Sequence, residues 1–321
     1  MTATAKLLGR LKFLKPETQS SLYRNDLVRM VRDHRGNFVE SQGVATELRE
    51  LQIADARKVA PTARMALEKN GFELVDAPVA SYDYLDHERI TGHYYRDCED
   101  LVAAQTGGRV WAFDHNIRSA SGQAGKRQEK GGQDVQAPAH IVHGDYTLRS
   151  APERLLQLTQ APNVNDTLKA DPRAKQGLIP DDLAQHALSA GGRFSIINVW
   201  RNIQPQPVLT HPLALCDGLT VDPKDLVVFE IHMPDRVGEN YWSKYNSRQR
   251  YYSYPELTRD EALLIKQWDS AGALAQSGGA KSDHQDEGIC TFSFHSAFHQ
   301  SQTPADAPDR WSVEVRCVVI H

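Results

Sequence analysis

Short stretches that alternate apolar with polar residues recur along most of the chain, and this two-residue period predicts β-strands. The expected strands are rich in β-branched and aromatic residues and span 13–14, 27–31, 72–75, 110–114, 193–200, 213–216, 226–231, 290–295 and 312–320. A hairpin is expected over 241–254, with its turn at Asn246 and Ser247. Many short strands with long irregular connections favour a mainly β, cupin-like jelly roll with helices outside it.

Helical spacing of apolar residues occurs in fewer places. The expected helices span 44–70, 86–107, 151–158, 181–188 and 258–271. The last of them opens with Thr258 and Glu261, which have the spacing of a capping box. Gly71 is expected to cap the first helical region at its C-terminal end. Residues 119–138 are rich in glycine and charge, so they are expected to form a mobile loop, either plainly disordered or serving as a lid.

The first 80 residues contain few apolar positions, which are too few for an independent core. They are therefore expected to form an N-terminal extension of mixed α/β structure. This extension would pack on a jelly-roll domain formed by residues 81–321. A chain of 321 residues is long enough to bury a large core in such an arrangement.

Composition narrows the range of functions. Hydrophobic residues make up 40% and charged residues 24% of the chain, as in ordinary globular enzymes. The net charge is −4 without a concentrated Lys/Arg block, which argues against nucleic acid or a membrane as partner. The 4 cysteines are scattered, and no apolar run resembles a secretory signal, so a cytoplasmic protein with free thiols is expected. The oligomeric state stays open.

The strongest candidate for chemistry is a set of three possible metal ligands. His143 and Asp145 are two residues apart, and on a strand such residues point to the same face. His295 is the best third ligand. Two histidines and one carboxylate form the facial triad of non-haem Fe(II) oxygenases, which leaves positions open for a co-substrate and O₂. His140 and His299 are rival ligands, but His140 would face away from His143 on a strand, and His299 follows the expected strand in a loop.

A second pair lies near the C-terminus. Arg310 and Ser312 are two residues apart, and a guanidinium beside a hydroxyl can bind a carboxylate through several hydrogen bonds. Arg316 is a rival, since it shares the same strand face, and Glu314 between the two arginines needs one of them as a partner. These residues suggest an iron oxygenase that uses a dicarboxylic keto acid.

Four further residues are candidates for contact with a small-molecule substrate. His115 and Arg118 follow the expected strand 110–114, whereas Asn198 and Arg201 lie on or beside the expected strand 193–200. Structural hydrogen bonding accounts equally well for His115 and Arg118. Asn198 and Trp200 share one strand face, opposite to that of Arg201, so one of these sets is expected to face the pocket and the other the outside. The sequence does not identify the substrate.

Several motifs in combination carry a family resemblance. They are His143-x-Asp145 with His295, Arg310-x-Ser312, Phe113-Asp-His-Asn-Ile-Arg118, Asn198-Val-Trp-Arg201, Pro212-Leu-Ala-Leu-Cys-Asp217, 255–262 (Pro-Glu-Leu-Thr-Arg-Asp-Glu-Ala) and Ser312-Val-Glu-Val-Arg316. From about residue 80 to its end, the chain resembles Fe(II)/2-oxoglutarate-dependent dioxygenases. The nearest subfamily includes asaB-type hydroxylase/desaturases, GA4 desaturase-like proteins and the cephamycin C-7 hydroxylase component. The resemblance implies a double-stranded β-helix, the cofactors Fe(II), 2-oxoglutarate and O₂, and hydroxylation, desaturation or ring formation in secondary metabolism.

Two other classes stay open. One is a cupin-like metalloenzyme that does not use 2-oxoglutarate, and the other is a non-catalytic jelly-roll binding protein. A nucleophilic hydrolase is disfavoured because the chain has no Gly-x-Ser-x-Gly elbow. A nucleotide-binding enzyme is disfavoured because both the Gly-x-Gly-x-x-Gly and the P-loop patterns are missing.

Overall fold

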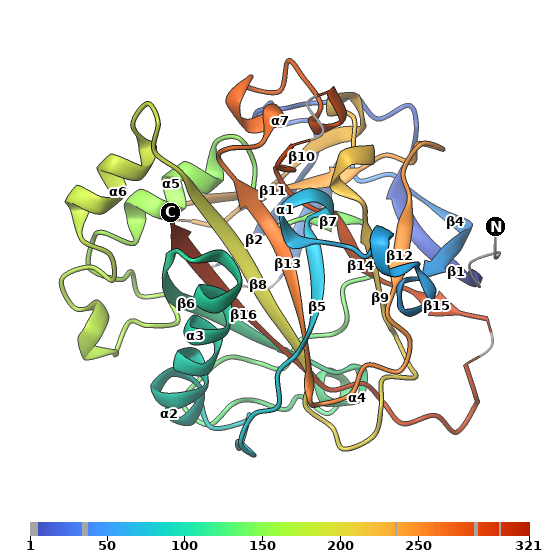
Figure 1. Cartoon of the computed structure of the whole chain (residues 1–321), viewed down its shortest axis with the longest axis horizontal. Coiled ribbons are helices and arrows are strands. Elements are labelled where there is room, and N and C mark those ends of the chain that lie inside the picture. The colour runs from blue at the N-terminus through green and yellow to red at the C-terminus, as the bar shows by residue number, and fades with distance from the viewer. Residues whose placement is uncertain (1–5, 34–37, 235, 286–287, 302) are drawn as a thin grey trace.

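Two β-sheets account for most of the regular structure (Figure 1). The computed structural model describes residues 6–33, 38–234, 236–285, 288–301 and 303–321. The strands of the larger sheet are β1 (Lys6–Leu14), β2 (Arg29–Arg32), β3 (Phe38–Gln42), β4 (Thr46–Asp55), β7 (His143–Gly144), β9 (Leu213–Cys216), β10 (Leu226–His232), β11 (Val237–Ser243), β12 (Tyr251–Ser253), β14 (His295–Ala297) and β15 (His299–Gln300). Those of the smaller sheet are β5 (Phe72–Asp76), β6 (Arg109–Arg118), β8 (Phe194–Asn202), β13 (Glu261–Asp269) and β16 (Ser312–Ile320).

The strand orders place segments from distant parts of the sequence side by side. Within the described ranges, the larger sheet runs β15-β1-β4-β12-β9-β14-β7-β11-β10-β2-β3, and the smaller sheet runs β5-β13-β8-β16-β6. The prediction of a mainly β protein is confirmed. The first 80 residues supply strands to both sheets, namely β1 to β4 and β5. The proposed boundary at residue 80 stays a prediction.

Short helices lie at the ends and outer faces of the sheets (Figure 1). The α- and π-helical segments are α1 (Leu67–Asn70), α2 (His87–Arg89), η3 (Ile90–Tyr94), α3 (Tyr95–Thr106), α4 (Ala120–Ala124), α5 (Ser150–Gln157), α6 (Asp181–Leu188) and α7 (Ala273–Gln276). The 3₁₀ turns are η1 (Ala56–Lys58), η2 (Pro61–Ala63), η4 (Pro172–Ala174), η5 (Gly218–Thr220), η6 (Pro223–Asp225) and η7 (Asp283–Gln285). Helix α3 packs against β6 and β16. In the described part of the chain, no helix combines the length and apolar character needed to cross a membrane.

The smaller sheet is built around β16, which lies between β6 and β8 and is antiparallel to both. Val313 and Val315 on this strand are fully buried and belong to a core that also includes Phe13 of the larger sheet. Burial on both faces explains the run of β-branched residues in β16. The prediction of a final strand over 312–320 is confirmed.

Two predicted helices are wrong. Residues 46–55 form β4, which pairs along its whole length with β1. Residues 261–269 form β13, a buried strand between β5 and β8. The Thr258 backbone N–H still donates to Glu261 Oε2 at 2.9 Å, as in a capping box, but a strand follows it. Pairing with distant strands has outweighed local helical preference in both segments. The predicted cap at Gly71 is confirmed by its left-handed φ of 85°.

Three other local predictions need correction. Strands β11 and β12 do not form the hairpin expected over 241–254, because β7, β14 and β9 lie between them in the sheet. The strand expected over 290–295 begins only at His295. The segment 119–138 contains helix α4 and the buried Glu129, so it is not plainly disordered, and its mobility and its role as a lid stay predictions.

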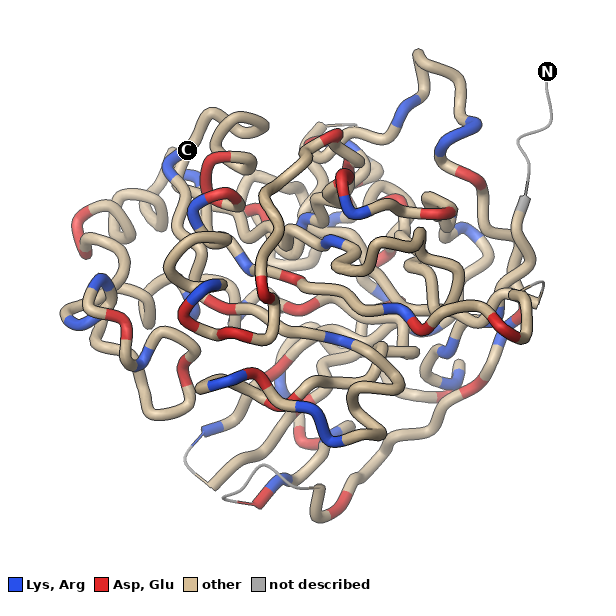
Figure 2. The backbone as a smooth tube through the Cα atoms, turned by 90° about the horizontal axis from the view of Figure 1, so that it is seen from below, with Lys and Arg blue, Asp and Glu red and all other residues tan. Residues whose placement is uncertain are grey.

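Charged residues of both signs are interspersed along the backbone rather than gathered by sign (Figure 2).

Candidate metal centre

The three predicted metal ligands meet at one point of the larger sheet. His143 on β7 is the cross-strand partner of His295 on β14, and their ring centroids are 4.4 Å apart. His143 Nε2 lies 3.6 Å from Asp145 Oδ1. One ligand atom from each of the three residues lies within 4.8 Å of the others. Strand β7 has only two residues, so Asp145 follows its end and the predicted strand geometry holds only in part.

Hydrogen bonds orient His143. Its Nδ1 lies 2.8 Å from the backbone oxygen of Ile141. Because a carbonyl oxygen only accepts, Nδ1 carries the proton and the lone pair is on Nε2. This is the nitrogen that faces Asp145. The imidazole is therefore held in the tautomer that a metal requires.

The Asp145 carboxylate is fixed through one of its two oxygens. Asp145 Oδ2 accepts hydrogen bonds from Asn198 Nδ2 at 2.9 Å and from Arg316 Nε at 3.1 Å. The backbone N–H of Asp145 donates to Gln267 Oε1 at 3.0 Å, and Gln267 Nε2 lies 3.4 Å from His295 Nδ1. Asp145 Oδ2 is therefore occupied by hydrogen bonds from the protein, while Oδ1 faces the imidazoles.

Burial and neighbouring charges set the ionisation of these groups. Burial lowers the pKa of His143 to about 4; His295 acts in the same direction, whereas Asp145 opposes it. Burial likewise lowers the pKa of His295. Burial alone would raise the pKa of Asp145, but Arg316 and the two histidines outweigh it and hold the pKa well below its usual range. The group thus consists of two neutral imidazoles and one carboxylate, which are the forms that bind a divalent metal.

A small cavity beside the triad has an unusual polar wall. It is lined by Arg118, His143, Trp200, His295, Arg310 and Glu314, among others. Arg310 is 3% exposed and Ser312 is 1% exposed. Among the described residues, neither Arg310 Nε nor Ser312 Oγ has a hydrogen-bond partner. Buried polar atoms without partners are costly, so the Arg310 guanidinium at the cavity and the Ser312 hydroxyl two residues along the chain fit an anionic ligand that would satisfy them.

Arg310 has few protein contacts for a buried guanidinium. Its Nη1 donates to the backbone oxygen of His211, and its guanidinium carbon lies 5.6 Å from the centre of the Trp200 ring. Burial lowers the pKa of Arg310 to about 9, and Arg118 acts in the same direction while Glu314 opposes it. A bound carboxylate would offset this cost by pairing with the guanidinium.

Arg316, the rival anchor, is engaged differently. Besides Asp145, it binds Asp114 through Nη1 at 2.8 Å and Glu314 through Nη2 at 3.4 Å. The prediction that Glu314 pairs with one of the arginines is therefore confirmed. Burial disfavours the charged guanidinium, but the surrounding carboxylates raise the pKa of Arg316 well above its ordinary value. Its positive charge is thus paired with three carboxylates of the protein, Asp145 among them.

The structure brings only two of the four substrate candidates to this site. Arg118 lines the cavity, and Asn198 contacts Asp145. Arg118 lies on β6 and Asn198 lies on β8. These two strands pair with β16 from either side; Arg316 lies on β16, and Arg310 lies just before it.

His115 and Arg201 lie elsewhere. His115 is fully buried, with Tyr95 Oη at 2.8 Å from its Nδ1 and Glu129 Oε1 at 3.0 Å from its Nε2. Arg201 is bound to Tyr94 and to the backbone oxygen of Ala77. His115 is three residues from Arg118 on β6, and Arg201 is three residues from Asn198 on β8. Because side chains alternate along a strand, His115 and Arg201 point to the face opposite the site. Gln267 and Trp200 are site residues that the sequence did not single out as such.

A mainly β chain with a buried His-Asp-His group beside an arginine-lined cavity defines a candidate metalloenzyme. Residues 11–320 match the family described as oxidoreductase/YMDC permease-like domain, and the chain belongs to this family. It is 38% identical over 196 residues to the "Uncharacterized protein in dcmA 3'region" of Methylophilus leisingeri, covering 60% of this chain and 89% of that protein.

Longer matches connect the chain with fungal oxidoreductases. It is 26% identical over 293 residues to "Oxidoreductase R1" of Phoma sp., covering 84% of this chain and 85% of that one. It is 27% identical over 238 residues to "Fe(II)/2-oxoglutarate-dependent dioxygenase nvfI" of Aspergillus novofumigatus, covering 73% and 68%. The solved structure titled "iron and alpha-ketoglutarate-dependent endoperoxidase NvfI" superimposes with a TM-score of 0.69 at 23% identity, over 99% of this chain and 98% of that one. This similarity shows a shared fold.

Proposed function

We propose that the protein is an Fe(II)/2-oxoglutarate-dependent dioxygenase that hydroxylates, desaturates or cyclises a small molecule. The observation that carries this proposal is the clustering of His143, Asp145 and His295, together with a cavity that His143 and His295 line with Arg310, whose Nε has no partner among the described residues. The names of the fungal relatives support the same chemistry. Within this proposal, the two sheets form the double-stranded β-helix, or jelly roll, of such oxygenases.

The metal would be held by the two imidazoles and by Asp145 Oδ1. The donor set fits Fe(II), because two histidines and a carboxylate leave positions open for other ligands. When bound, iron together with 2-oxoglutarate and O₂ supplies the oxidant that attacks a substrate C–H bond. The protein keeps the ligands deprotonated, holds Asp145 in place through Arg316 and Asn198, and surrounds the centre with buried side chains.

The keto acid would be held by Arg310 and Ser312 through its distal carboxylate. The guanidinium of Arg310, just before β16, and the hydroxyl of Ser312, the first residue of β16, offer a charge-assisted contact and a second hydrogen bond to the same group. Arg316 is not assigned this role, because its nitrogens already bind three carboxylates. Arg310 is therefore favoured as the main anchor.

The substrate would enter the same cavity. Trp200, Leu213 and Ala297 supply apolar lining, and Arg118 supplies a charge besides that of Arg310. This combination suits a small, largely apolar molecule with a polar or acidic group. We assign no substrate role to His115 or Arg201.

Succinate production by the purified protein tests the proposal. The protein is incubated with Fe(II), 2-oxoglutarate and O₂, with and without a panel of small apolar acids, and succinate is quantified. We expect metal-dependent succinate that is lost in His143→Ala and kept in His186→Ala, a matched exposed histidine on α6. A protein that binds iron but forms no succinate under any condition would point to the cupin-like alternative.

A further inference from the structure

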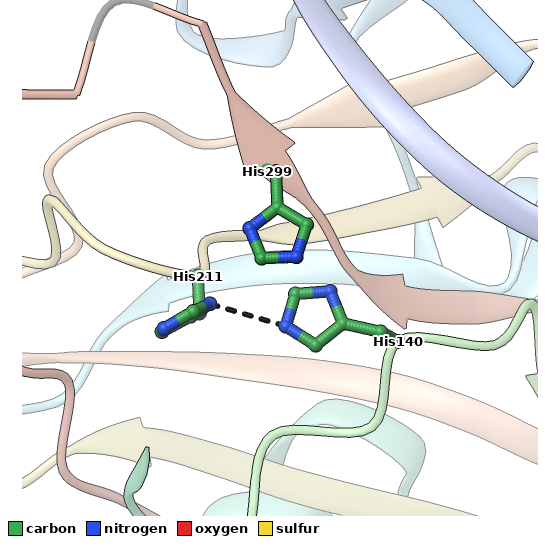
Figure 3. Close-up of side chains that lie close together, drawn as sticks. All are labelled: His140, His211 and His299. Carbon is green, nitrogen blue, oxygen red and sulfur yellow. Dashed lines mark hydrogen bonds between the residues drawn. The ribbon is translucent and has the colours of Figure 1, made fainter. Parts of the chain in front are cut away.

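A second group of three histidines lies outside the proposed iron site (Figure 3). His140 precedes β7, His211 precedes β9, and His299 lies on β15. His140 Nε2 is 3.1 Å from His211 Nδ1, and the rings of His140 and His299 stack with centroids 4.2 Å apart. One nitrogen from each ring lies within 4.8 Å of the others. Three separate segments therefore converge on one point.

The spacing of these nitrogens is close to that of a metal site. Metal–nitrogen bonds of about 2.0–2.1 Å in tetrahedral geometry place two ligand nitrogens about 3.3–3.5 Å apart. His140 Nε2 and His211 Nδ1, which are hydrogen-bonded at 3.1 Å, lie slightly closer than this and would move apart by a few tenths of an ångström, while a nitrogen of His299 lies within 4.8 Å of both. His299 is exposed, whereas the other two are half-buried, so an ion can enter from solvent and the His299 ring has room to turn.

The backbone at His211 supports a function for this cluster. His211 has a φ of 47°, a left-handed conformation that a side chain with a Cβ adopts at an energetic cost. Two hydrogen bonds from Arg310 stabilise this conformation. Its guanidinium donates to the His211 backbone oxygen, and its backbone N–H donates to Thr210 Oγ1 at 2.9 Å. The protein thus holds this turn in a strained form that directs the ring toward His140.

The three imidazoles are in the form that binds a metal. Burial lowers the pKa of His140 to about 3, with His299 and His211 acting in the same direction. The pKa values of His211 and His299 are also lowered, in each case chiefly by burial. All three rings are therefore neutral near pH 7.

A third cluster, formed by His87, His115 and Glu129, is a weaker candidate for a metal site. Both ring nitrogens of His115 already have protein partners there.

We propose that His140, His211 and His299 form a second metal site that binds a divalent transition metal, with Zn²⁺ as the expected occupant. Three imidazoles without a carboxylate favour Zn²⁺, Ni²⁺ or Cu²⁺ over Mg²⁺ or Ca²⁺. Water would complete the coordination on the exposed side. This inference does not rest on the proposed oxygenase activity. The bound ion would link His299 on β15 to the turn at His211, whose backbone oxygen accepts a hydrogen bond from Arg310. It would therefore connect the surface to the wall of the cavity.

Zinc titration of the whole chain tests the site. The chelator-treated protein is titrated with Zn²⁺ by calorimetry, as wild type and as a His143→Ala/His295→Ala variant that lacks the proposed iron site. We expect about two equivalents in wild type and about one in the double variant. Adding His299→Ala should weaken the remaining binding by at least ~10-fold, because a lost ligand should cost no less than a lost supporting contact. His186→Ala should change nothing.

A second readout covers the case in which the double variant does not fold. In an otherwise wild-type chain, His299→Ala should weaken one of the two Zn²⁺-binding events by at least ~10-fold and leave the other unchanged. His299 is exposed, so folding should be unaffected. Unchanged affinity of both binding events in His299→Ala, or a folded double variant that binds no Zn²⁺, would overturn the proposal. Failure of succinate production would leave these outcomes unchanged.

Discussion

Arg316 and Asp145 form an ion pair in the interior of the site, with Arg316 Nε 3.1 Å from Asp145 Oδ2 and only 13% and 11% of their side chains exposed. The pair occupies one oxygen of the carboxylate and leaves the other facing His143. It also keeps the carboxylate ionised against the effect of burial. One contact thus sets both the charge and the direction of the proposed metal ligand.

Replacing Arg316 with methionine should destabilise the protein strongly. The change leaves Asp145 and Asp114 without their cationic partner, and breaking a buried pair in this way costs about 3–5 kcal/mol. Urea unfolding of the apoprotein measures the effect. As control, Arg248→Met removes an exposed ion pair with Asp222 and should cost less than about 1 kcal/mol. Equal effects of the two substitutions would contradict the assigned role.

Arg310 and Ser312 should control affinity for 2-oxoglutarate but not for iron. Losing a hydrogen bond to a charged group costs about 1.5–3 kcal/mol, so Arg310→Ala should weaken 2-oxoglutarate binding by roughly 10- to 100-fold. Ser312→Ala should have a smaller effect, about 2- to 10-fold. Calorimetric titration of the Fe(II)-loaded protein measures both. Unchanged 2-oxoglutarate affinity in Arg310→Ala would show that Arg310 does not bind the keto acid.

Gln267 should support the metal site without binding the metal. Its amide accepts from the Asp145 backbone N–H and lies beside the His295 ring. Loss of such supporting contacts typically weakens metal binding by about 10- to 100-fold, which we expect for Gln267→Leu. Gln249→Leu is a matched control, because Gln249 is also buried but contacts Asp225 and Ser243. If both variants bind Fe(II) like wild type, the supporting role is absent.

The apoprotein should lose stability as the pH falls below neutrality. The pKa values of His140 and His143 are lowered to about 3 and about 4, whereas unfolded histidine has a pKa near 6.5. The unfolded chain therefore takes up protons first, and the free energy of unfolding should decrease from about pH 6.5 down to about pH 4 or 3. Urea unfolding across this range gives the slope, which should be shallower in His140→Gln. Parallel slopes in the two proteins would show that His140 does not contribute.

The sequence could predict that His143 and Asp145 lie together because local spacing brings them together, whereas the assignment of His295 rests on the family resemblance. His143 and Asp145 are two apart, and β16 has the composition of a buried strand over its whole length. The contacts between strands could not be predicted in the same way. Asp145 follows β7 of the larger sheet and Arg316 lies on β16 of the smaller sheet, so their contact depends on how the two sheets meet.

Gln267 and the cluster of His140, His211 and His299 could not be predicted, for related physical reasons. Gln267 lies on β13, whose leucine and isoleucine positions also fit a helix, so its direction was not predictable without β5 and β8 as neighbours. From the sequence, His140 and His299 are only rival ligands for the iron site. Their meeting with His211 depends on a turn with positive φ that no sequence pattern indicates. Local periodicity carries little information about such convergence of loops.

The most direct test of the account is an anaerobic titration of the apoprotein with Fe(II) and then with 2-oxoglutarate, followed by visible absorption. We predict a metal-to-ligand charge-transfer band in wild type that is absent in His143→Ala and appears only at higher 2-oxoglutarate concentration in Arg310→Ala. Retention of iron without any band would contradict the keto-acid site. Failure of the folded wild-type protein to bind Fe(II) at all would contradict the central claim.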